Sequence, residues 1–113
     1  MLDESPPESE MVPYPEDEPL AAILHEIGPR NFEKFGECPE FQAWCAQREA
    51  EVEAAGRNDA AQVAFEIRRG LLFLRAGCLH NARIIWDDAM MVAEASGDPT
   101  LIDQLENLLN THR

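Results

Sequence analysis

The chain has 113 residues and a formal net charge of −13, which leaves room for one domain. So negative a chain is not expected to bind nucleic acid or an anionic membrane surface, because both require a positive face. No apolar run approaches the roughly 20 residues that span a bilayer, and the first residues lack the basic start and apolar stretch of a signal peptide. Three cysteines without paired spacing are typical of a reducing compartment. These features predict a soluble cytoplasmic protein.

The first 19 residues are predicted to form a disordered, proline-rich acidic tail. They contain seven acidic residues, no basic residue and five of the eight prolines. Such a segment has too little apolar surface to offset the conformational entropy that folding would remove.

Residues 20–37 are predicted to form a short helical cap segment. The run LAAILHEI (20–27) is long enough for about two turns of amphipathic helix. Gly28 and Pro29 end this helix, and the NFEKFG run that follows supplies two aromatic side chains, Phe32 and Phe35.

A helical domain is predicted over residues 38–113. Its first helix begins at Pro39, because proline is favoured at the first helical position, and ends at Gly56. The apolar residues of this helix lie mostly on one face: Phe41, Trp44, Cys45, Val52 and Ala55. A second helix is expected to follow an Asp59 N-cap and to stop at Gly77.

A third helix is predicted from about Leu79 to Ala95, and Gly97 ends it. Asp98 followed by Pro99 is a strong start signal for the last helix. Strand patterns are absent from the sequence. The predicted fold is therefore all-α, built of antiparallel helical hairpins.

Two joints between the predicted helices have similar sequences. EAAGRNDA (53–60) and EASGDPT (94–100) each carry an acid, two small residues, a glycine and an aspartate, and their glycines lie 41 residues apart. A unit of this size that recurs is typical of an α-helical repeat.

The stretch between these joints resembles a tetratricopeptide repeat, a pair of helices with small residues at their contacts and large residues between them. The matching residues are Gly70, Phe73, Gly77, Leu79, Ala82, Trp86 and Ala89. The resemblance implies that Gly70 and Ala82 let the two helices approach each other, while Phe73 and Trp86 fill the space beside them.

The resemblance covers about residues 63–99 and extends loosely to the flanking helices. Glu66 and Arg69 depart from the pattern, which prefers an aromatic residue and a leucine there. Pro99 comes late, as in the longer repeats of kinesin light chains. The alternative is a general antiparallel helix bundle with the same small-residue contacts.

No cluster of acids, bases or nucleophiles points to an enzyme, and the sequence has no phosphate-binding loop. Cys38, Cys45, Cys78 and His80 could offer three sulfurs and one nitrogen to zinc, but their spacing matches no common ligand loop, so neither a metal nor another cofactor is expected. Cys78 precedes a helix N-terminus near Arg75, a setting that can lower the pKa of a thiol. Alternatively, Cys78 is simply a small residue in the turn before the helix.

One stripe of the second helix is the candidate partner-binding surface. It consists of Ile67, Leu71 and Leu74, with Arg68 and Arg75, which are expected to be solvent-exposed, beside it. In a tetratricopeptide repeat this side lines the concave groove. The resemblance therefore implies that these residues hold an amphipathic helix or an extended segment that bears carboxylates. Alternatively, the arginines pair with nearby acids or with the tail. The apolar stripe then has three possible neighbours: the first helix with Phe41 and Trp44, the LAAILHEI segment, or a partner.

The predicted function is that of a small adaptor or chaperone that binds another polypeptide. Size and acidity are similar to those of compact tetratricopeptide chaperones of bacterial secretion systems. The alternative is a regulatory protein whose acidic tail imitates nucleic acid and occupies a basic partner. A core of about seventy residues buries limited area, which leaves self-association open.

Overall fold

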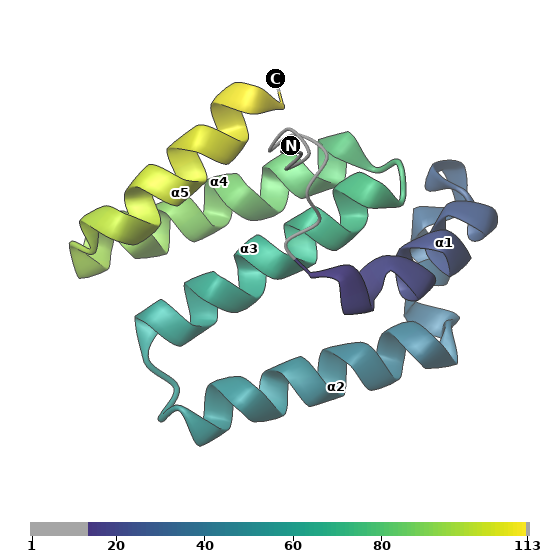
Figure 1. The fold of residues 1–113 in the computed structure, drawn as a ribbon, viewed down its shortest axis with the longest axis horizontal. Helices are drawn as coiled ribbons and strands as arrows, with labels where there is room; N and C mark the ends of the chain where they lie inside the picture. Colours follow the sequence, from purple (N-terminus) through teal and green to yellow (C-terminus); the bar gives the residue numbers. More distant parts are fainter. Residues whose placement is uncertain (1–13, 113) are drawn as a thin grey trace, which may run out of the picture.

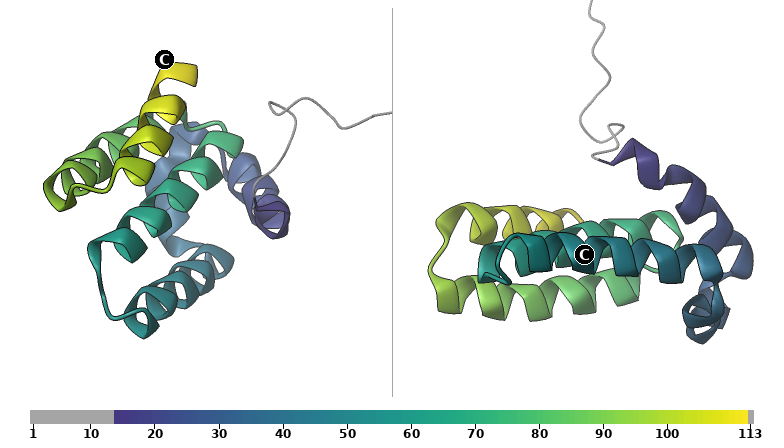
Figure 2. Two further views of the ribbon diagram at one scale, coloured as in Figure 1. Left: turned by 60° about the vertical axis from the view of Figure 1, so that its left-hand side comes forward. Right: turned by 90° about the horizontal axis from the view of Figure 1, so that it is seen from below.

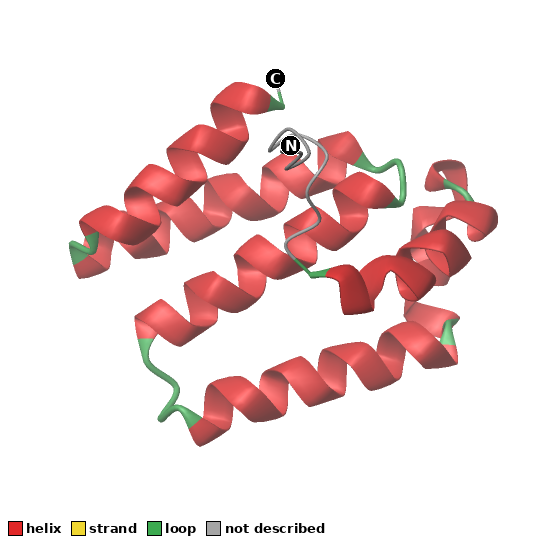
Figure 3. Ribbon diagram, in the orientation of Figure 1, coloured by secondary structure: helices red, strands yellow, loops and turns green. Residues whose placement is uncertain are grey.

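The computed structural model describes residues 14–112, and all the regular structure in this range is helical (Figures 1 and 3). A short 3₁₀ turn, η2, precedes helix α1, and a longer 3₁₀ segment, η3, leads into four longer helices. Their bounds are η2 Pro15–Asp17, α1 Glu18–Ile27, η3 Pro29–Glu37, α2 Pro39–Ala54, α3 Asp59–Arg75, α4 Leu79–Ser96 and α5 Pro99–Thr111. The helices α2 to α5 follow one another in alternating directions (Figure 1). The all-α prediction is confirmed for the described residues.

Local signals fix most of the helix ends. Pro39 is the first residue of α2, and the glycines that follow α1 and α4, Gly28 and Gly97, have positive φ angles of 100° and 75°, which glycine adopts readily. Asp98 caps α5, because its side chain accepts hydrogen bonds from two backbone N–H groups of the first turn.

The predicted N-cap of α3 is wrong by one residue. Asn58 has the extended backbone of a cap, and its side-chain oxygen accepts a hydrogen bond of 2.7 Å from the backbone N–H of Ala61. Asp59 is the first residue of the helix itself, where its negative charge still interacts favourably with the positive end of the helix dipole.

The closest packing in the molecule is that of α3 against α4. Trp86 on α4 is fully buried, and its Nε1 donates a hydrogen bond of 3.3 Å to the carbonyl oxygen of Ile67 on α3. A Cβ atom on Gly70 would lie only 2.6 and 2.8 Å from Cε2 and Cδ1 of this ring. Gly70 therefore makes room for the Trp86 indole. The predicted contact between Gly70 and Ala82 stays a prediction. Ala82 and Ala89 are nevertheless buried on α4.

An aromatic cluster joins η3 and the start of α2 to the second half of α3. The ring of Phe73 lies 5.1 Å from that of Phe32, 5.9 Å from that of Phe35 and 5.7 Å from that of Phe41, measured between centroids. In Figure 2, η3 and α1 lie at the end of the molecule where α3 turns into α4. Phe32 and Phe35, the aromatic residues of the predicted cap segment, therefore anchor η3 on α3.

The predicted tail is partly wrong. Residues 15–19 belong to helical elements: Pro15–Asp17 form η2, and α1 begins at Glu18 rather than at Leu20. Asp17 is only 4% exposed, because its carboxylate has partners elsewhere in the fold. Residues 1–13, the rest of the predicted tail, lie outside the described residues. Within residues 14–112, no helix is long and apolar enough to cross a membrane.

We predict that Gly70→Ala destabilises the protein. In an open helix the change would stabilise by about 1 kcal/mol, but here the added Cβ overlaps the buried ring of Trp86. We expect a net loss of about 1–3 kcal/mol in the free energy of unfolding, measured by urea denaturation. Gly36→Ala is the matched control, because no atom lies within 4 Å of a Cβ at that position. Equal stability of the Gly70→Ala chain and the wild type would contradict the packing described.

Candidate partner-binding surface on helix α3

The side chains of Asp17 and Arg68 form a buried ion pair between the start of α1 and the middle of α3. Arg68 donates two hydrogen bonds to the carboxylate, from Nε to Oδ2 at 2.8 Å and from Nη2 to Oδ1 at 2.9 Å. A third donor, Nε1 of Trp44 on α2, lies 2.9 Å from Oδ1. One carboxylate thus links three helices, although its residue belongs to the predicted tail.

Arg68 is enclosed by the same N-terminal segment. Its side chain is only 13% exposed, so the prediction that this arginine is solvent-exposed is wrong. Glu16 accepts a further hydrogen bond of 3.2 Å from Nη2, and the ring of Tyr14 lies 4.4 Å from Cζ, within the range of a cation–π contact. The guanidinium lies between the carboxylates of Asp17 and Glu16 and the rings of Tyr14 and Trp44.

These contacts change the pKa values of both partners. Burial alone would raise the pKa of the Asp17 carboxyl, but the hydrogen bonds from Arg68 and Trp44, with the charges of Arg68 and Arg48, outweigh it and hold this pKa below its ordinary value. The hydrogen bond to Asp17 raises the pKa of Arg68, against the opposite effect of burial. Asp17 is therefore ionised throughout the neutral range, and the pair is a true ion pair.

The other predicted arginine also pairs with this segment. Arg75 forms an ion pair with Glu18 in the first turn of α1, and both side chains are partly exposed, at 38% and 41%. Such a pair contributes much less stability than a buried one, because water screens it. The pair of Arg75 with Glu18 therefore contributes less to the docking of α1 on α3 than the pair of Arg68 with Asp17 does.

Helix α1 lies beside part of the predicted surface. It packs against α3, and its buried residues are Leu20, Ala21 and Leu24. On α3, Ile67 is buried, whereas Leu71 and Leu74 are half-buried. The structure places the N-terminal segment against Arg68 and Arg75 and beside Leu74, three of the five predicted partner-binding residues.

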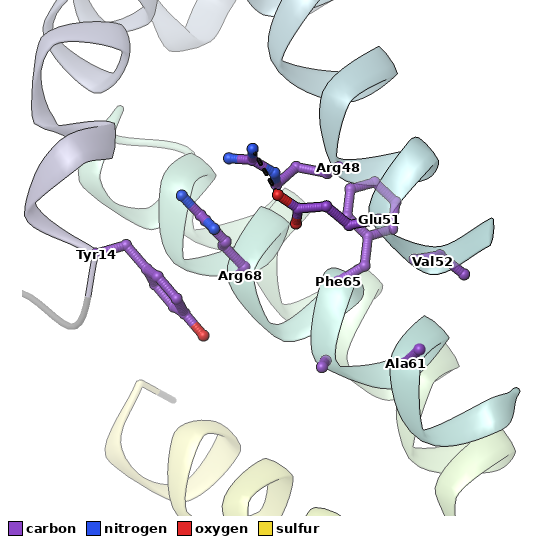
Figure 4. A pocket seen from close by; sticks show the side chains of 8 residues that line it. Tyr14, Arg48, Glu51, Val52, Ala61, Phe65 and Arg68 are labelled. Carbon is purple, nitrogen blue, oxygen red and sulfur yellow. Dashed lines mark hydrogen bonds and ion pairs between the residues drawn. The ribbon is translucent and has the colours of Figure 1, made fainter. Parts of the chain in front are cut away.

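Two hollows flank the docked segment. A cavity of about 240 Å³ lies between α2 and α3, lined by Tyr14, Arg48, Glu51, Val52, Ala61, Ala64, Phe65 and Arg68 (Figure 4). Arg48 donates a hydrogen bond of 2.9 Å to Glu51 there. A second hollow, of about 510 Å³, lies between α1 and the last turn of α3, where Ala21 and Ala22 face Leu74 and Arg75.

Sequence reasoning missed Tyr14, Asp17, Trp44 and Arg48 as parts of this site. Asp17 and Glu18 stand immediately before an amphipathic helix, which was the available signal, since acids in that position favour a helix start. Their partners are 51 or more residues away in the sequence, and no local pattern identifies such a pairing.

None of the three cysteines is fully exposed to solvent. Cys38 and Cys78 are buried and Cys45 is half-buried, all with free thiols. Burial raises the pKa of the Cys78 thiol, so the idea of a lowered value at the start of α4 is wrong. Among residues 14–112, no three His, Cys, Asp or Glu side chains are grouped so that they could hold a metal ion.

Comparisons with known proteins add no relative: no family model matches the chain, and no curated protein or solved structure is significantly similar to it.

We predict that Asp17→Asn lowers the free energy of unfolding by about 3 kcal/mol at neutral pH, because it leaves the buried Arg68 without its principal counter-charge. Since the folded-state pKa of Asp17 is depressed, its stabilising effect is full above the pKa of the unfolded chain, about 4. It is lost as the pH falls through the lower folded-state value.

Denaturation curves at a series of pH values test this prediction. The difference between wild type and Asp17→Asn should be constant near neutrality and should shrink below about pH 4. Asp88→Asn, at an exposed position on α4, is the matched control and should change stability by less than about 0.5 kcal/mol. A difference that grew on acidification would show that Asp17 does not stabilise the fold as an anion.

Proposed function

We propose that this chain is a small adaptor or chaperone that binds another polypeptide on the α3 surface formed by Ile67, Arg68, Leu71, Leu74 and Arg75. The observation that supports the proposal most is the nature of the segment on that surface. It is an amphipathic helix with an acidic first turn, and its carboxylates meet Arg68 and Arg75. A surface that accepts such a helix in cis has the shape and charge to accept one in trans.

The tetratricopeptide-like arrangement belongs to this proposal. In its favour, Gly70 and Phe73 on α3 are buried, as are Ala82, Trp86 and Ala89 on α4. Gly77 has a positive φ of 91° in the turn between the two helices. In a repeat of this kind the side of α3 that faces away from α4 serves binding. We accordingly propose a cytoplasmic binding protein rather than an enzyme.

The alternative, an acidic protein that imitates nucleic acid, finds less support. Three of the seven acids of the predicted tail, Glu16, Asp17 and Glu18, are engaged by Arg68 and Arg75 of the same chain. Of these, Asp17 is buried in its pair, whereas Glu16 and Glu18 stay partly exposed, at 62% and 41%. The other four lie outside the described residues, so the alternative rests on the sequence alone.

A photo-crosslinking amino acid in place of Leu74 tests the proposed function. This half-buried residue lies beside α1, so the probe would contact whatever occupies the α3 surface. We expect irradiation of the full chain in an extract of its source to yield one discrete adduct with another polypeptide. Met91, 68% exposed on α4, is the control position, and it should not give that adduct.

A charge reversal at Arg75 distinguishes specific binding from chance contact. Arg75→Glu reverses a charge in a partly exposed pair, so the fold should survive while the Leu74 adduct decreases at least tenfold. Equal adducts from the Leu74 and Met91 positions, or an adduct that Arg75→Glu leaves unchanged, would refute partner binding at this surface.

A further inference from the structure

Helix α1 combines two kinds of contact with α3. Its start provides adjacent carboxylates, Asp17 for the buried Arg68 and Glu18 for the partly exposed Arg75. Three and seven residues after Asp17 come Leu20 and Leu24, which are both buried. This spacing places one acid and two leucines on one side of the helix.

Any segment that binds this surface must place a carboxylate next to Arg68. An arginine side chain that is only 13% exposed is costly to leave unpaired, because its charge is partly removed from water. A neutral or basic segment on this surface would leave that charge without a partner. The site therefore selects against segments that lack an acid at the position of Asp17.

The contact between α1 and the end of α3 is not completely filled. A hollow of about 510 Å³ remains there, and Ala21, Ala22 and Leu74 form its apolar part, beside Glu18, His25, Glu26 and Arg75. Ala22 is exposed and Leu74 only half-buried. A longer apolar side chain at the position of Ala22 would extend over Leu74 and bury area that α1 leaves open to water.

We infer that the polypeptide bound at the α3 surface presents an amphipathic helix with two adjacent carboxylates at its start and a larger apolar residue where α1 has Ala22. The inference rests on the proposed function and specifies its partner. In this arrangement α1 is an internal competitor that satisfies the arginines but fills the apolar surface incompletely, so a partner helix of the stated chemistry displaces it.

Labelled peptides test the inference on the full chain. The chain carries Asp17→Asn and Glu18→Gln, which weaken α1 in cis, and the probe is a fluorescent peptide with the sequence of residues 14–28. We expect fluorescence anisotropy to give at least tenfold tighter binding to this chain than to the wild type. The peptide with Ala22→Leu should bind at least fivefold tighter still, and the peptide with Asp17→Asn and Glu18→Gln at least tenfold more weakly than the native peptide.

A charge exchange controls for effects on the helicity of the peptide. Adding Arg75→Glu to the weakened chain should reduce binding of the native peptide, and a peptide with Glu18→Arg should recover it. Changes in peptide helicity alone would act equally on the weakened chains with and without Arg75→Glu and would give no such recovery. A Glu18→Arg peptide that binds both forms of the chain equally would overturn the assigned pairing.

Other outcomes separate this inference from the proposed function. If the Leu74 adduct with a polypeptide forms but acidic and amide peptides bind alike, or Ala22→Leu gives no gain, the partner chemistry is wrong and the binding function stands. If neither the adduct nor peptide binding occurs, both fail. Should the weakened chain not fold, Ala22→Leu in the otherwise native chain replaces it: a raised unfolding midpoint is expected, and an unchanged or lowered midpoint would overturn the inference.

Discussion

The buried pair between Asp17 and Arg68 is the interaction on which the N-terminal half of the structure depends. A guanidinium inside a helical protein needs a carboxylate close by, because the loss of hydration is otherwise uncompensated. Asp17 meets this need and also accepts a hydrogen bond from Trp44 on α2. Its position therefore determines where α1 docks, and with it how η3 and the start of α2 approach α3. The aromatic rings around Phe73 then fill the space that this arrangement encloses.

Helix α3 serves two interfaces that differ in chemistry. Toward α4 the contact is apolar and close, and the missing side chain of Gly70 admits the Trp86 ring. Toward α1 the contact combines a few apolar side chains with ion pairs, and hollows remain at its edges. The first interface is part of the buried core, since Ala82, Trp86 and Ala93 of α4 are fully buried. The second resembles the surfaces on which proteins hold exchangeable helices, where charge selects the ligand and apolar area strengthens its binding.

Features encoded in neighbouring residues could be predicted from the sequence, and features that depend on distant partners could not. Pro39, Gly28, Gly97 and Asp98 act on the turn in which they stand, so the helix ends were found to within a few residues. Asn58 and Asp59 are both good caps, and only the backbone conformation distinguishes them. The order of residues 14–19 and the burial of Arg68 both arise from one contact across 51 positions. Taken separately, an acidic proline-rich segment and an arginine on a helix each indicate solvent exposure. For the same reason, the stripe on α3 could be identified, whereas its occupant could not.

The nine-residue η3 segment has a consequence for the strength of binding. It connects α1 to α2 over a short span, so α1 is never far from α3 even when it has left the surface. A short tether gives an attached ligand an effective concentration on the order of millimolar. The apparent affinity of a free segment that competes with α1 is then reduced in proportion to the fraction of time for which the surface is vacant. Under the proposed function, the tethered α1 therefore sets an affinity threshold. A free helix at low concentration occupies the surface only if its intrinsic affinity greatly exceeds that of α1.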